Sequence, residues 1–234
     1  MTTSHETTPS SERSTYDRLR ALVLSLELLP GERLSERGLE DTLGASRTPI
    51  RAALMRLENE GLTRRLGRGW QVTPVDLTEI RSAMEFRETL EAGIVALAAQ
   101  QADAEAVQAL VELSETPEGE PDDAETGLRG GTDFHVVLAM LTGNHFFADA
   151  IRDVMTRISR TRWLEVRTEA SRAQLRAEHR AIAEAIGAGD PAAAVALSRA
   201  HTHGTRDRLM ATLDAERHRL RARGLSIIES ETLG

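Results

Sequence analysis

The chain has 234 residues, enough for one large domain or two small ones with a buried core, and its formal net charge is −8. It has no cysteine, which excludes disulfides, thiolate metal sites and a cysteine nucleophile, so a transition-metal site would need histidine and carboxylate ligands. No apolar run approaches the roughly 18–20 residues of a membrane span. The Thr/Ser-rich start lacks the apolar segment of a signal peptide. We therefore expect a cytoplasmic protein with a disordered tail over residues 1–12.

Charge is unevenly distributed along the chain. Residues 13–75 hold 11 arginines and 8 acids, a net charge of about +3, whereas residues 76–223 hold 18 arginines and 25 acids, about −7. This asymmetry favours two domains, a basic one over residues 13–75 and an acidic one over residues 76–222, followed by a C-terminal tail over residues 223–234. A basic module on an acidic body would direct a polyanion such as DNA to one face of the protein.

The segment 29–62 predicts two short helices joined by a glycine turn, and the second helix has two segregated faces. The apolar face consists of Ile50, Leu54 and Leu57, and the basic face consists of Arg47, Thr48 and Arg51. The apolar face can pack against a core. The basic face is then free to meet phosphates and base edges.

Local signals mark the ends of the second helix and a hairpin after it. Pro49 falls in the first turn, where no amide hydrogen is needed, and either Ser46 or Thr48 can cap the helix. Gly61 stands where a left-handed residue ends a helix. Residues 62–73 predict two strands around an Arg/Gly tip, a wing whose glycines let the backbone approach DNA closely.

These residues resemble the GntR family of bacterial transcription regulators, whose signature is close to PGxxLxExxLAxxLGVSRTPVREALxxLExEGL. The resemblance covers about residues 16–75 and implies a winged helix-turn-helix that binds double-stranded DNA. The candidate DNA-contacting residues are Arg37, Ser46, Arg47, Thr48, Arg51 and Gly69. Arginine suits this role because its guanidinium can bond the O6/N7 edge of guanine bidentately. The sequence departs from the signature at Gly38, at Glu40-Asp41 and at Ala52, all off the arginine face.

From residue 76 onward the pattern predicts an all-α bundle of about six helices, so the fold class is mostly α. Breaks are expected at residues 117–127, 143–144 and 187–191. The acidic stretch 115–125 has the composition of a surface loop. Asp190 followed by Pro191 is a clear start for the last long helix.

The first bundle helix places two charged residues on its apolar stripe. The stripe is Leu77, Ile80, Met84, Arg87, Glu91, Ile94 and Ala98. Burying charge without a partner costs several kcal/mol. Either Arg87 and Glu91 form an internal ion pair that fixes the bundle, or Glu91 holds Arg87 toward a cavity for a carboxylate effector.

Three histidines fall at inward positions of three different helices. His179 lies on a stripe with Leu175, Ile182 and Ile186; His201 follows Leu197 by one turn; His135 stands beside Phe134 and one turn before Leu138. Each histidine alone fits a hydrogen-bonded core residue. Together, on facing helices, they fit a site for a divalent transition metal such as zinc.

This second region resembles the helical effector domain of the FadR subfamily of the same family, called FCD. The matching segments are residues 87–91, 134–135 with 142–144, 178–182 with 189–190, and 199–201. Metal-binding members have an Asp four residues before the first histidine, where this chain has Gly131. Asp133 is two residues before His135 and should point the opposite way, unless the helix begins at Asp133 and turns it inward. Otherwise three histidines plus water or ligand oxygens would hold the metal, or none would bind.

The sequence therefore predicts a homodimeric, ligand-responsive regulator rather than an enzyme. The resemblance implies a repressor that binds a palindromic operator and is released by a small organic acid at the metal site, with Arg87 neutralising the acid. Three alternatives remain: a pure metal sensor, a constitutive DNA-binding regulator whose pocket has lost its ligand, and a metalloenzyme. The last leaves the N-terminal motif unexplained.

Overall fold

A computed structural model describes residues 14–222 and 227–230, without the side chains of residues 216–222. The tail expected over residues 1–12 lies outside the described residues. The chain divides into two compact units between Thr73 and Pro74. Within the described residues, no helix has both the length and the apolar character needed to cross a bilayer.

The N-terminal unit combines three helices with a small antiparallel sheet. Its elements are α1 (Thr15–Leu24), β1 (Arg33–Leu34), α2 (Glu36–Leu43), α3 (Arg47–Asn59), β2 (Thr63–Leu66) and β3 (Gly69–Val72). Strand β3 lies between β1 and β2, and Leu66 pairs with Gly69 across a tight turn. This is the expected winged helix-turn-helix.

Glycines follow the C-terminal ends of α2 and α3, and a serine caps the start of α2. Ser35 caps α2 by accepting a hydrogen bond from the Gly38 amide, and Gly44 ends that helix with φ +54°. Ser46 occupies the N-cap position of α3, but its side chain makes no capping hydrogen bond. Gly61 follows α3 with φ +72°, as the sequence predicted.

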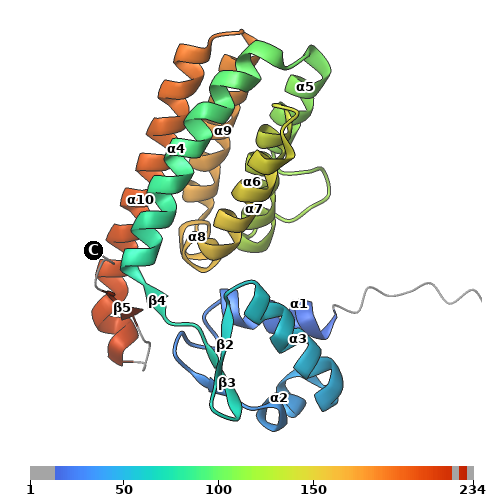
Figure 1. Cartoon of the computed structure of the whole chain (residues 1–234), viewed down its shortest axis with the longest axis vertical. Helices are drawn as coiled ribbons and strands as arrows, with labels where there is room; N and C mark the ends of the chain where they lie inside the picture. The colour runs from blue at the N-terminus through green and yellow to red at the C-terminus, as the bar shows by residue number, and fades with distance from the viewer. Residues whose placement is uncertain (1–13, 223–226, 231–234) are drawn as a thin grey trace, which may run out of the picture. The chain divides into compact units, whose positions relative to one another are not determined.

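The C-terminal unit is a helical bundle closed by a short parallel strand pair. Its helices are α4 (Leu77–Gln101), α5 (Ala104–Leu113), α6 (Ala124–Met140), α7 (His145–Arg157), α8 (Ser159–Glu165), α9 (Glu169–Gly187) and α10 (Pro191–Ala222). The long helices α4 and α10 run side by side, and β5 (Ile227–Ile228) lies beside β4 (Val75–Asp76) (Figure 1). A mostly helical fold is confirmed, with seven helices in the described part of this unit.

Two helix starts differ in how well the sequence indicated them. Asp190 caps α10 by accepting from the amides of Ala192 and Ala193, which confirms the predicted start at Pro191. Helix α6 begins at Ala124, inside the expected loop 117–127, because Asp123 accepts from the Thr126 amide. The expected C-terminal tail also contains structure, since β5 falls within it.

The inward stripe predicted for the first bundle helix is confirmed. Every residue of that stripe is buried in α4, which also buries Val95. Arg87 is 0% exposed and Glu91 1%. The chain therefore buries two charges at the centre of the bundle, next to helices α6, α9 and α10.

Candidate functional site

Helix α3 presents the basic surface that its sequence pattern indicated. Ile50, Leu54 and Leu57 are fully buried. Arg47, Thr48 and Arg51 are exposed on the same helix, as are Ser46 before it and Arg37 on α2. The two faces are therefore separated as amphipathic spacing requires.

Carboxylates of α2 bond the two recognition arginines. The Nε and Nη2 atoms of Arg51 donate to the two carboxylate oxygens of Glu36 at 2.6 and 2.7 Å. Arg47 Nε lies 3.4 Å from an oxygen of Glu40. The hydrogen bonds from Arg51 hold the pKa of Glu36 below its usual value; burial opposes this shift, and the positive charge of Arg51 adds to it. The sequence interpretation did not anticipate these pairs, because the partners lie on separate helices.

The wing contributes further arginines next to this surface. Arg65 and Arg68 line an open cleft together with Arg51 and Glu36. The Arg65 guanidinium lies 3.7 Å from the centre of the Trp70 ring. Gly69 has a packing reason to be glycine, since a Cβ atom there would lie 3.2 Å from the Leu34 carbonyl oxygen.

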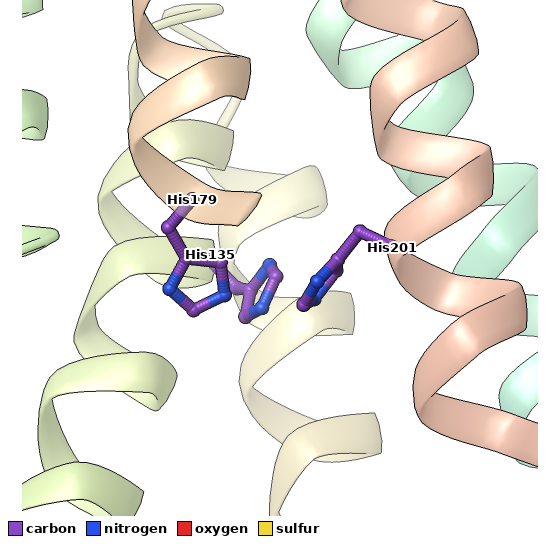
Figure 2. A group of neighbouring side chains, drawn as sticks. All are labelled: His135, His179 and His201. Atoms are coloured by element: carbon purple, nitrogen blue, oxygen red, sulfur yellow. The ribbon is translucent and has the colours of Figure 1, made fainter. Parts of the chain in front are cut away.

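The three predicted histidines meet inside the helical unit. His135 of α6, His179 of α9 and His201 of α10 are 1%, 3% and 2% exposed. One ring nitrogen from each lies within 4.8 Å of the others. Figure 2 shows the rings turned toward one another from their separate helices. His201 is buried although Leu197, one turn before it, is exposed, so Leu197 was a poor guide to the inward face.

Carboxylates orient two of the imidazoles. Glu178 lies 2.7 Å from Nδ1 of His201, and Glu91 lies 3.0 Å from Nδ1 of His135. A carboxylate can only accept, so each Nδ1 donates and each Nε2 keeps its lone pair. Metal-binding histidines are commonly held by such carboxylate pairs. The Nε2 atom of His179 has no hydrogen-bond partner.

Arg87 donates to the same lone pairs. Its Nη2 atom lies 2.7 Å from Nε2 of His135 and 3.1 Å from Nε2 of His201. Its Nε atom donates to Glu91 at 2.8 Å. Arg87 thus forms the internal ion pair and also faces the histidines, while its Nη1 atom remains without a partner.

Burial keeps the histidine cluster neutral. Desolvation, followed by the charge of Arg87, lowers the pKa of His135 to about 3. Desolvation also lowers the pKa values of His179 and His201. Neutral imidazoles with inward lone pairs can coordinate a cation, and the guanidinium of Arg87 takes a cation's position between two of them. The three histidines therefore could hold a metal ion.

No fourth protein ligand joins this cluster in the part of the chain that the structure describes. Asp133 is exposed and lies within α6, which begins at Ala124, so the hypothesis that a helix start turns it inward is wrong. A Cβ atom at Gly131 would lie 2.6 Å from Nη2 of Arg162 and 3.6 Å from Cε1 of His179. Arg162 of α8 is 3% exposed and fills the space that a side chain at position 131 would need. Sequence spacing gave no signal for this contact.

Comparisons with known proteins agree with the division into two units. The family model described as bacterial regulatory proteins, gntR family, matches residues 12–72, and the FCD domain model matches residues 82–204. An uncharacterized HTH-type transcriptional regulator in an unstable DNA locus of Streptomyces ambofaciens is 32% identical over 200 residues, which cover 85% of this chain and 84% of that protein. The HTH-type transcriptional regulator LutR of Bacillus subtilis is 30% identical over 208 residues, 77% of this chain and 93% of LutR.

Solved structures show the same fold. E. coli McbR/YncC superimposes with a TM-score of 0.64 at 20% identity, covering 84% of this chain and 95% of that one. A putative transcriptional regulator GntR from Rhodococcus sp. RHA1 gives 0.64 at 22% identity, covering 82% and 94%. The chain therefore belongs to the GntR family of DNA-binding transcription regulators, with an N-terminal helix-turn-helix domain and a C-terminal FCD domain.

Proposed function

We propose that this regulator is a cytoplasmic repressor that binds a palindromic operator as a homodimer and is released by a small organic acid. The observation that supports this proposal most is the cluster of three buried, neutral histidines beside Arg87, in a domain separate from the basic face of α3. A constitutive DNA-binding protein would have no use for inward imidazole lone pairs and an orphaned Arg87 nitrogen.

DNA recognition is assigned to the exposed end of α3. The proposed contacts are Arg37, Ser46, Arg47, Thr48, Arg51 and Gly69. A recognition helix of this kind enters the major groove with its N-terminal residues on base edges. On binding DNA, Arg47 would leave Glu40 and Arg51 would leave Glu36. These ion pairs are exposed, so separating them costs little free energy.

The effector site is assigned to the histidine cluster. His135, His179 and His201 would hold a divalent transition metal, zinc being the best match to three imidazoles. When bound, such an ion supplies Lewis-acid coordination for the oxygens of a carboxylate ligand. Arg87 would neutralise the acid. Glu91 and Glu178 keep the ring proton of His135 and His201 on Nδ1, so that each Nε2 lone pair is available to a metal.

Exposed apolar side chains support a homodimer through the helical unit. Phe86, Met140 and Phe146 are 51%, 58% and 70% exposed. Phe86 also lines a groove with Ala150 and Val154, between α4 and α7. Contiguous apolar surface of this kind is typical of subunit contacts. A two-fold dimer would present two copies of α3 to two half-sites.

The test combines metal analysis with operator binding. Metal content is measured by mass spectrometry on untagged wild type and on His179→Ala, and an operator selected from random DNA is titrated with and without metal and organic acids. About one metal per chain, lost in the variant, with operator release by acid plus metal, supports the proposal. Release by metal alone would make the protein a metal sensor. Operator binding that responds to neither would make it constitutive.

A further inference from the structure

Two glycines of α6 make room for two arginines from neighbouring helices. A Cβ atom at Gly127 would lie 2.8 Å from Cδ of Arg172, and one at Gly131 would lie 2.6 Å from Nη2 of Arg162. The glycines are one turn apart, so they share a helix face. Any larger residue at either position would displace an arginine.

The two arginines differ in their counter-charges. Arg172 donates from Nε to Asp122 at 2.7 Å and from Nη1 to the Val166 carbonyl at 3.0 Å. Arg162 donates to the Thr132 hydroxyl at 2.9 Å and forms no ion pair among the described residues, although Glu165 and Glu91 are close enough to influence its charge. Burial, followed by repulsion from Arg87, lowers the pKa of Arg162 to about 10, while the charges of Glu165 and Glu91 act in the opposite direction, so the group is still charged at neutral pH. A buried charge without an ionic partner is costly, and a bound anion would remove that cost.

A cavity gives an anion access to Arg162. It has a volume of about 110 Å³, and its lining includes Gly131, Arg162 and His179. One water molecule needs roughly 10–15 Å³ on this measure, so a small carboxylate can fit. His179 also lines this cavity, and its buried Nε2 atom has no hydrogen-bond partner. The acidic residues of the lining are Glu112, Glu115 and Asp133; Glu115 is already bonded to Arg180.

We propose that this cavity binds a small carboxylate through the guanidinium of Arg162, with His179 as its neighbour. The planar fork of arginine fits a carboxylate with two parallel hydrogen bonds. The inference rests on the proposed function and sharpens it. Gly131 has no carboxylate to pair with Arg162, so the carboxylate of the effector would supply the negative charge. Arg162 would recognise this charge alongside Arg87, whose own charge Glu91 partly offsets.

The test measures anion binding directly, without DNA. Calorimetric titration of the full-length, metal-free chain with succinate, citrate and inorganic phosphate is compared among wild type, Arg162→Gln, Gly131→Asp and Arg160→Gln. Arg162→Gln removes the guanidinium, and Gly131→Asp places an internal carboxylate against it. Arg160→Gln is the matched control: it removes another buried arginine of α8, one that bonds the Pro74 carbonyl instead of lining this cavity.

We expect wild type and Arg160→Gln to bind succinate or citrate and both other variants to lose at least tenfold in affinity. If Arg162→Gln does not fold, Gly131→Asp decides the question alone. Absence of carboxylate binding in wild type, binding of phosphate only, or unchanged affinity in the folded cavity variants would overturn the proposal. Operator titration separates the two claims: carboxylate binding that depends on Arg162 but leaves operator affinity unchanged would retain the site and reject ligand-responsive repression.

Discussion

Arg51 in the N-terminal unit and Arg87 in the helical unit each bond a glutamate at short distance, in opposite surroundings. The Arg51 side chain is 60% exposed and its partner Glu36 17%, whereas the side chains of Arg87 and Glu91 are 0% and 2% exposed. Water can replace either partner of the first pair, so DNA phosphate can do so as well. Separating the second pair leaves a charge in the core. The same two residue types thus make an exchangeable contact in one unit and a fixed one in the other.

The largest expected effect comes from breaking the buried pair. Arg87→Ala leaves the buried charge of Glu91 without its ion-pair partner and removes the donor to His135 and His201. We therefore expect the free energy of unfolding to fall by about 3–5 kcal/mol. Urea unfolding of the helical unit measures this loss. The double variant Arg87→Leu/Glu91→Leu should recover most of it, because no charge is then left unpaired. A loss below about 1 kcal/mol in Arg87→Ala would contradict the proposed cost of an unpaired charge.

The exposed pair should affect DNA binding instead of folding. Arg51→Ala is expected to weaken operator binding roughly ten- to hundredfold at constant salt, since a base-contacting arginine is lost. Fluorescence anisotropy with a labelled operator checks this, and the unfolding curve should not move. Arg56→Ala is the control on the same helix, because Arg56 lies over the Tyr16 ring. Equal losses in both variants would indicate a general charge effect.

Two serines of the N-terminal unit sharpen the contrast between folding and binding roles. Ser35→Ala removes the cap of α2 and should cost about 1 kcal/mol of unfolding free energy. Ser46→Ala should cost little, because the Ser46 side chain makes no capping bond. If Ser46→Ala lowers operator affinity while stability holds, the hydroxyl contacts DNA. Equal thermal shifts in the two variants would argue against this division.

The smallest effect is expected from freeing Arg51. Glu36→Gln weakens its ion pair with Arg51, so operator affinity should rise a few-fold. The gain should shrink as salt is added, because salt screens exposed pairs. Glu36→Asp, which retains the charge on a shorter side chain, is the comparison. A fall in affinity with Glu36→Gln would mean that the glutamate positions Arg51 for DNA.

Periodicity predicted much of this molecule because both units bury one face of each helix. The stripe of α4 and the two faces of α3 follow from residues three or four apart, and the same spacing indicated the inward position of His179. The break between α4 and α5 is marked only by the N-cap Asp103, and the break between α7 and α8 at Ile158 contains no glycine, proline or capping side chain.

The contacts that define the candidate site were harder to predict. The sequence showed only that Gly131 stands where the family has an Asp ligand. The close approach of Arg162 to Gly131 could not be predicted, because the two residues are distant in the chain. The ion pairs of Arg47 and Arg51 likewise cross from α3 to α2. A sequence pattern shows which face a residue takes, but not which side chain from another element meets it there.

The strand pair at the base of the helical unit joins the beginning of that unit to the end of the described chain. Val75 pairs with Ile227 and Asp76 with Ile228, and the hydroxyl of Thr78 donates to the Ser230 carbonyl. Because the two ends of the unit meet, it is suited to circular permutation at one of its loops. A chain cut after Ala222 would instead leave Val75 and Asp76 as an unpaired edge, open to association with other chains.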